Sequence, residues 1–132
     1  MFGHEKFIAY QYSIQFAALA SQIIEKLPEG HAKLIDQLRR AAVSISLNIA
    51  EGSGKNTESQ KCHCYAIARA EAMECAAIMD ILECMRLLES SNARQAKELL
   101  ENVVAILCSV CNKNYQSKKG PKKARETMDA RQ

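Results

Sequence analysis

Apolar side chains recur every three or four residues along most of the chain, which is the spacing of one face of an α-helix rather than of a β-strand. Breaks in this pattern leave four segments, which we predict to be helices over residues 5–27, 32–51, 57–88 and 93–115. Pro28-Glu29-Gly30 ends the first segment, because proline disfavours helix in the residue before it and glycine forms a flexible link. Thr57-Glu58-Ser59-Gln60 is a capping-box pattern that starts the third.

The connections between these segments are short, so successive helices are expected to run antiparallel as an up-down-up-down four-helix bundle. Gly52-Ser53-Gly54 is interpreted as the break that terminates the second helix at Gly52. That helix carries two apolar faces, and the smaller one comprises Ala41, Val43, Leu47 and Ala50. Two apolar faces imply burial on more than one side, either within the bundle or against another subunit.

Composition agrees with an all-α fold. The chain has 132 residues, of which 48% are hydrophobic and 25% charged, as expected for one globular domain with a core of useful size. Five Gly and two Pro are too few to form the many turns of a β-sandwich or barrel. We therefore predict a bundle over residues 1–117 and a basic flexible tail over residues 118–132.

The amino terminus has no leader pattern, and no apolar stretch is long enough to cross a bilayer. These features predict a cytoplasmic protein without membrane contact. The six cysteines lie within helical segments of a chain large enough to fold without disulfides, so we expect free thiols.

Charge is unevenly distributed. The net charge is +3, but residues 113–132 carry seven basic and two acidic side chains, which leaves −2 on residues 1–112. A basic segment of this kind can contact a polyanion, although it can also be simply a solvated tail. Its candidate nucleic-acid-binding residues are Lys118, Lys119, Lys122, Lys123 and Arg125.

A second basic set lies in the predicted helices and the link between them. It could form a phosphate-binding surface at one end of the bundle, and its members are Arg39, Arg40, Lys55, Lys61 and Arg69. The alternative is a hydrogen-bonded and ion-paired network with Asn48, Glu51 and Glu74 that fixes helix register or a subunit interface.

Metal and catalytic sites are disfavoured by geometry. Cys62 and Cys64 lie about 200° apart around a helix, so their thiols cannot converge on one ion. Cys108 and Cys111 are expected beside residues 69–72, roughly 9–15 Å along the hairpin from the first pair. The string Gly52-Ser53-Gly54-Lys55 lacks the strand and the hydroxyl residue of a phosphate loop. We predict no enzyme activity, no metal and no cofactor.

Two strings resemble a known family. Arg40-Ala-Ala-Val-Ser-Ile45 and Asn48-Ile-Ala-Glu-Gly52, with Ala68-Arg69 and Glu74 beyond them, are similar to the four-helix-bundle proteins encoded in intervening sequences of bacterial large-subunit ribosomal RNA genes. The resemblance covers roughly residues 2–116. It implies an up-down protomer that assembles into a homopentamer, and a relation to the accessory variability proteins of diversity-generating retroelements, which associate with a reverse transcriptase and with nucleic acid.

Two functions follow as hypotheses. The first is a non-enzymatic homo-oligomer that binds RNA or DNA electrostatically, as part of an RNA-linked or reverse-transcriptase-linked assembly. Low aromatic content, 5% with no Trp, argues against a base-stacking platform. The alternative is a protein-interaction scaffold without a direct nucleic acid role, which the slightly acidic body favours. A metal or redox role for the cysteines ranks below both.

Overall fold

The computed structural model describes the backbone of residues 1–119 and the side chains of residues 1–112. A short 3₁₀ helix, η1, precedes four α-helices, and the elements are η1 Gly3–Lys6, α1 Ile8–Glu25, α2 Ala32–Ser53, α3 Glu58–Cys84 and α4 Ser90–Lys119. The described part of the chain contains no strand. The all-α prediction with four long helices is therefore confirmed.

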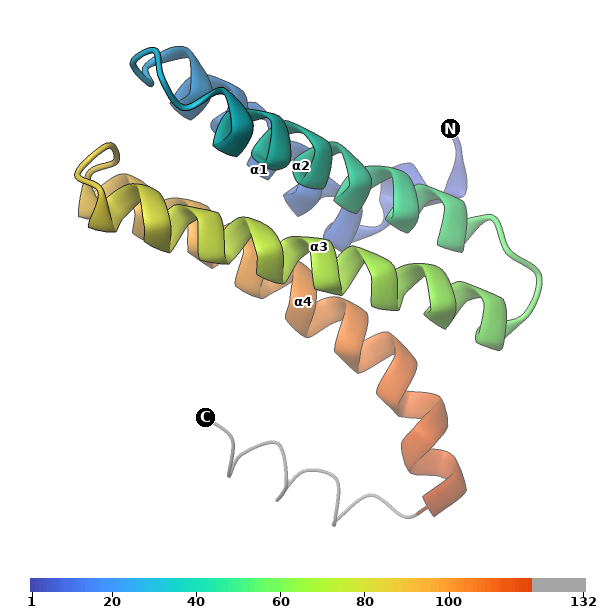
Figure 1. Cartoon of the computed structure of the whole chain (residues 1–132). Coiled ribbons are helices and arrows are strands. Elements are labelled where there is room, and N and C mark those ends of the chain that lie inside the picture. Colours follow the sequence, from blue (N-terminus) through green and yellow to red (C-terminus); the bar gives the residue numbers. More distant parts are fainter. Residues whose placement is uncertain (120–132) are drawn as a thin grey trace.

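The helices form two antiparallel hairpins, α1/α2 and α3/α4, which pack against each other (Figure 1). The α1–α2 and α3–α4 turns lie at the same end of the molecule, and the α2–α3 connection lies at the other (Figure 1). Each helix contacts its two neighbours in the order α1, α2, α3, α4 and back to α1. The side chains that fill the middle of this bundle come from all four helices and include Phe16, Leu38, Ile45, Ile49, Met79, Leu82, Leu100 and Leu107.

Helices α2 and α3 approach closely because the residues between them are small. Ala41 on α2 and Ala68 and Ala72 on α3 are fully buried. Gly52 lies within α2, and a Cβ added there would stand only 2.7 Å from Cε1 of Tyr65 on α3. Helix α2 ends within the predicted Gly52-Ser53-Gly54 string, but at Ser53 rather than at Gly52, and Gly52 makes room for the Tyr65 ring.

Helix α3 ends four residues before the predicted Leu88. Arg86 adopts a left-handed backbone conformation with φ of 60°. The amide of Arg86 donates to the carbonyl of Glu83 at 3.0 Å, and that of Leu87 donates to the carbonyl of Leu82 at 2.9 Å. These two bonds form a Schellman motif, which ends a helix and usually has glycine in the left-handed position. Because this position has arginine instead of glycine, the sequence does not indicate that α3 ends here.

Helix α4 begins at Ser90 and continues to Lys119, beyond the predicted end at residue 115. Lys118 and Lys119, predicted as the start of the tail, belong to the backbone of this helix. The rest of the predicted tail, including Lys122, Lys123 and Arg125, lies outside the described residues.

The contact between Gly52 and Tyr65 yields a stability prediction. Replacing Gly52 by Ala forces a methyl group against the Tyr65 ring and the Cβ of Cys64, so we expect unfolding to become easier by about 2 kcal/mol, as in other overpacked interfaces. Urea denaturation measures this change. Gly54→Ala is the matched control, because its Cβ would meet only backbone oxygen at 3.6 Å, and its stability should stay near that of the wild type. Equal effects of the two substitutions would contradict the packing role of Gly52.

Candidate functional site

Arg40, a candidate phosphate ligand, is held by two carboxylates. Its Nη2 lies 2.9 Å from Oε2 of Glu74, and its Nη1 lies 3.2 Å from Oε2 of Glu71. The hydrogen bond to Glu74, followed by the charge of Glu71, raises the pKa of Arg40 above its usual range. The cluster has one positive and two negative charges, so it repels phosphate. Its structural effect is to join α2 to α3 along their outer edge.

The other basic candidates of the body also have partners in most cases. Lys61 Nζ donates to the carbonyl oxygen of Ser53 at 3.1 Å, where a cation complements the carboxyl end of α2. Lys55 Nζ lies 3.6 Å from Oε1 of Glu51. Arg69 Nη1 donates to Sγ of Cys108 at 3.3 Å. Arg39 is exposed and takes part in none of these contacts.

The polar residues predicted to form one network are separate in the structure. Asn48 Nδ2 donates to the carbonyl of Ser44, one turn earlier in its own helix, at 2.8 Å. Glu51 pairs with Lys55 along the same segment of chain, whereas Glu74 links α3 to α2 through Arg40. Helix register is also supported by a contact that was not predicted from the sequence, in which the buried hydroxyls of Ser13 on α1 and Ser46 on α2 lie 2.9 Å apart.

The cysteines correct another expectation. Cys62 on α3 and Cys111 on α4 form a disulfide, with their Cα atoms 5.7 Å apart, so the prediction of free thiols throughout is wrong. Cys108 lies beside Arg69 as expected, but Cys111 lies beside Cys62 rather than within residues 69–72. The reason is the early end of α3, which moves the centre of the α3/α4 hairpin towards the amino terminus and places Cys111 beside an earlier residue of α3 than expected.

The remaining cysteines differ in how far they are buried. Burial, followed by the charges of Glu74 and Glu71, raises the pKa of Cys75 to about 12, so this thiol stays protonated at neutral pH. Cys64 is also buried, whereas Cys84 is exposed near the end of α3. Within the described residues no group of three or more His, Cys, Asp or Glu side chains is arranged to hold a metal ion.

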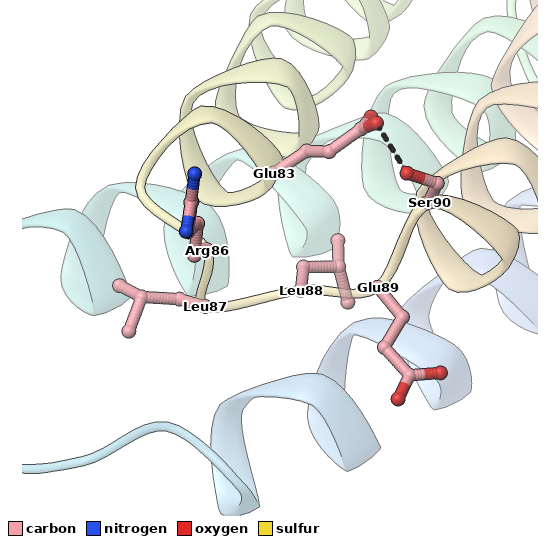
Figure 2. Close-up of a pocket in the computed structure, with 6 residues that line it drawn as sticks. All are labelled: Glu83, Arg86, Leu87, Leu88, Glu89 and Ser90. Atoms are coloured by element: carbon pink, nitrogen blue, oxygen red, sulfur yellow. Dashed lines mark hydrogen bonds between the residues drawn. The ribbon is translucent and has the colours of Figure 1, made fainter.

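A hollow of about 420 Å³ lies at the α3–α4 turn (Figure 2). Six residues line it, namely Glu83, Arg86, Leu87, Leu88, Glu89 and Ser90. Glu83 accepts a hydrogen bond from Oγ of Ser90 at 2.8 Å, and the other side chains point away from one another (Figure 2). The polar groups do not converge on one point, so the hollow is a consequence of the helix-ending turn rather than a ligand site.

The outer side of α2 exposes an apolar face. The side chains of Val43 and Leu47 lie one turn apart and are 54% and 63% exposed. The bond between Ser13 and Ser46 sets the register of α1 beside α2 and brings Ile14 to one flank. We call Ile14, Val43, Leu47 and Ile67 the α2 face.

Ile67 belongs to the other flank of the α2 face. The pair Arg40–Glu74 sets the register of α3 beside α2, and Ile67 lies two turns before Glu74 on the edge of α3 that borders α2. Ion pairs bound the face at both ends, Arg40 with Glu71 and Glu74 at one and Glu51 with Lys55 at the other. The sequence indicates a second apolar face on this helix. In the structure its residues do not share one environment, because Ala41 is buried inside the bundle while Val43 and Leu47 are exposed.

Comparison with known proteins places this bundle in a family. Residues 5–109 match the family model described as 23S rRNA-intervening sequence protein. The chain belongs to this family. The match includes the Arg40 cluster, Gly52 and the α2 face of this intervening-sequence protein, and it ends before Cys111 and the basic segment 113–132.

A solved structure supports the fold. The bundle is similar to the crystal structure of a protein with unknown function from the S23 ribosomal protein family of Bacteroides thetaiotaomicron, with a TM-score of 0.72 at 18% identity, over 78% of this chain and 97% of the other. No curated protein matches the chain. Among the described residues, no helix is long and apolar enough to span a membrane.

Proposed function

We propose that this intervening-sequence protein is a non-enzymatic, cytoplasmic homo-oligomer that binds nucleic acid through the basic segment 113–132. The observation that carries the proposal is the segregation of charge. Residues 1–112 have a net charge of −2, and most of their candidate cations contact partners within the bundle, whereas residues 113–132 have a net charge of +5. Phosphate contact is therefore assigned to the basic segment and not to Arg40, Lys55, Lys61 or Arg69.

Self-association is assigned to the α2 face. Burying one Val or Leu side chain contributes about 1.5–3 kcal/mol, so a surface with Val43 and Leu47 at its centre can supply a useful part of an interface. Its apolar centre and charged ends match the usual division of a protein interface into an apolar core and a polar rim. The assembly number in the proposal is five, as the family resemblance implies.

Assembly strengthens the binding that one segment provides. Each copy contributes +5, and lysine or arginine contacts to phosphate release counterions. Joining several weak contacts on one particle raises the overall affinity without any new kind of contact. Structured RNA or DNA is the proposed ligand, and a reverse transcriptase acting on that nucleic acid is the proposed enzyme partner.

The second candidate is a protein-interaction scaffold without nucleic acid contact. The acidic body and the internal pairing of Arg40 favour it, since both reduce attraction of the bundle itself for phosphate. In that case the α2 face or another helix surface contacts a protein partner, and its binding changes little with salt.

A charge introduced into the α2 face tests the assembly surface. Leu47→Asp places a carboxylate in the centre of the α2 face, so we expect the particle mass measured by light scattering to fall to that of the 14.7 kDa monomer while the helical circular dichroism is retained. Met73→Asp is the matched control, because Met73 is 65% exposed on α3 outside the α2 face, and it should keep the assembled mass. An unchanged mass for Leu47→Asp, or a monomeric wild type, would contradict this assignment.

A second set of variants tests the basic segment. Changing Lys118, Lys119, Lys122 and Lys123 together to Gln should weaken binding to RNA and DNA duplexes, because each lost phosphate contact removes about 0.9 from the slope of log K against log salt. Binding curves measured between about 50 and 200 mM salt give this slope, which should become shallower by roughly 2 to 4. The control Arg39→Gln with Lys55→Gln should leave it nearly unchanged. If the wild type binds neither duplex at low salt, the scaffold function replaces this one.

A further inference from the structure

The disulfide between Cys62 and Cys111 joins α3 to α4 near the end of the residues whose side chains the structure describes. It joins two helices across 49 residues of sequence, and both cysteines are partly exposed. Leu107 is fully buried, and Val110 and Cys111 pack against the core from the following turn. Cys111 lies eight residues before the helix ends at Lys119.

The cross-link therefore joins α4 to α3 at Cys111. On the amino-terminal side of Cys111, α4 is held by buried Leu107 and by the hydrogen bond from Arg69 to Cys108. At Cys111 itself, the disulfide to Cys62 attaches α4 to α3 covalently. The last turns of α4, which lead into the basic segment, follow directly from this point.

We propose that Cys62 and Cys111 form a reversible thiol–disulfide modification site that reacts with a low-molecular-weight disulfide and fastens the end of α4 to α3. In the forward direction one cysteine thiolate attacks the small disulfide and releases one small thiol, leaving a mixed disulfide. The second cysteine thiolate then attacks the protein sulfur of that mixed disulfide and releases the second small thiol. Two protein thiols are oxidised by two electrons, and one small disulfide is reduced to two thiols.

Geometry selects this pair among the six cysteines. A Cα separation of 5.7 Å lies within the range that a disulfide spans. Cys64 and Cys75 are buried, so small disulfides do not reach them in the folded protein. Cys84 is exposed, but it lies near the end of α3 that is remote from Cys62, and Cys108 contacts Arg69. Partial exposure of Cys62 and Cys111 gives a small reagent access to them.

The test uses the full chain and does not depend on nucleic acid binding. The protein is equilibrated with oxidised or with reduced glutathione, quenched in acid, then unfolded in denaturant, alkylated at neutral pH and weighed intact. We expect four alkyl groups in the oxidised form and six in the reduced form, with a peptide linking Cys62 to Cys111 only in the first. Closing a loop of this length should raise the melting temperature by about 10 °C.

Variants make the assignment specific. Cys62→Ser and Cys111→Ser should each abolish the difference in melting temperature between the oxidised and reduced forms, whereas Cys84→Ser, the control, should retain it. Amide hydrogen exchange in the turns of α4 after Cys111 should be faster in the reduced wild type than in the oxidised one. Six alkyl groups after oxidation, a link through another cysteine, or equal melting and exchange in both redox forms would each overturn the proposal.

Discussion

The close approach of α2 to α3 is the contact on which the other features of this structure depend. It requires a residue without a side chain at Gly52, where the Tyr65 ring occupies the space that a Cβ would take. It also requires small residues along the shared surface, as at Ala41 and Ala68. Short-range attraction between atoms is individually weak but large in sum, so two helices that come this close gain contacts along their whole length.

The packing of α2 against α3 also determines which side chains of α2 remain exposed to solvent. Ile45 and Ile49 face the core and are fully buried, whereas Val43 and Leu47 lie on the opposite side and are exposed. Arg40 then reaches across the outer edge to Glu71 and Glu74, which uses its charge within the bundle. One helix thus provides both an exposed apolar surface and an ion pair to the neighbouring helix.

Periodicity was sufficient to predict four helices, because apolar positions at intervals of three and four residues persist through each of them. It failed where the deciding partner is distant in sequence. Gly52 has the sequence pattern of a helix terminator, but its role in the structure is to leave space for the Tyr65 ring. Arg86 ends α3 in a left-handed conformation that glycine usually adopts. Because the sequence predicts that α3 ends at Leu88, the predicted register between α3 and α4 is displaced. That register does not bring Cys62 beside Cys111, where the structure places it.

The candidate site was less predictable than the fold for a related reason. Counting lysines and arginines identified the basic segment 113–132, but it could not tell which body cations already had partners. Those partners come from other helices or from backbone oxygens, as for Arg40 and Lys61. The exposed side of α2 was visible as a second apolar face, and the structure was needed to separate Ala41 from Val43 and Leu47.

We propose that packing of α2 against α3 leaves an apolar surface through which copies of the chain associate. Sedimentation equilibrium of the wild-type protein over a range of concentrations, at low salt and at about 1 M salt where the Debye length is about 3 Å, tests it most directly. The account predicts association that increases with concentration and persists at high salt, because burial of apolar surface is not screened. A monomer at all concentrations, or an assembly that dissociates as salt rises, would contradict it.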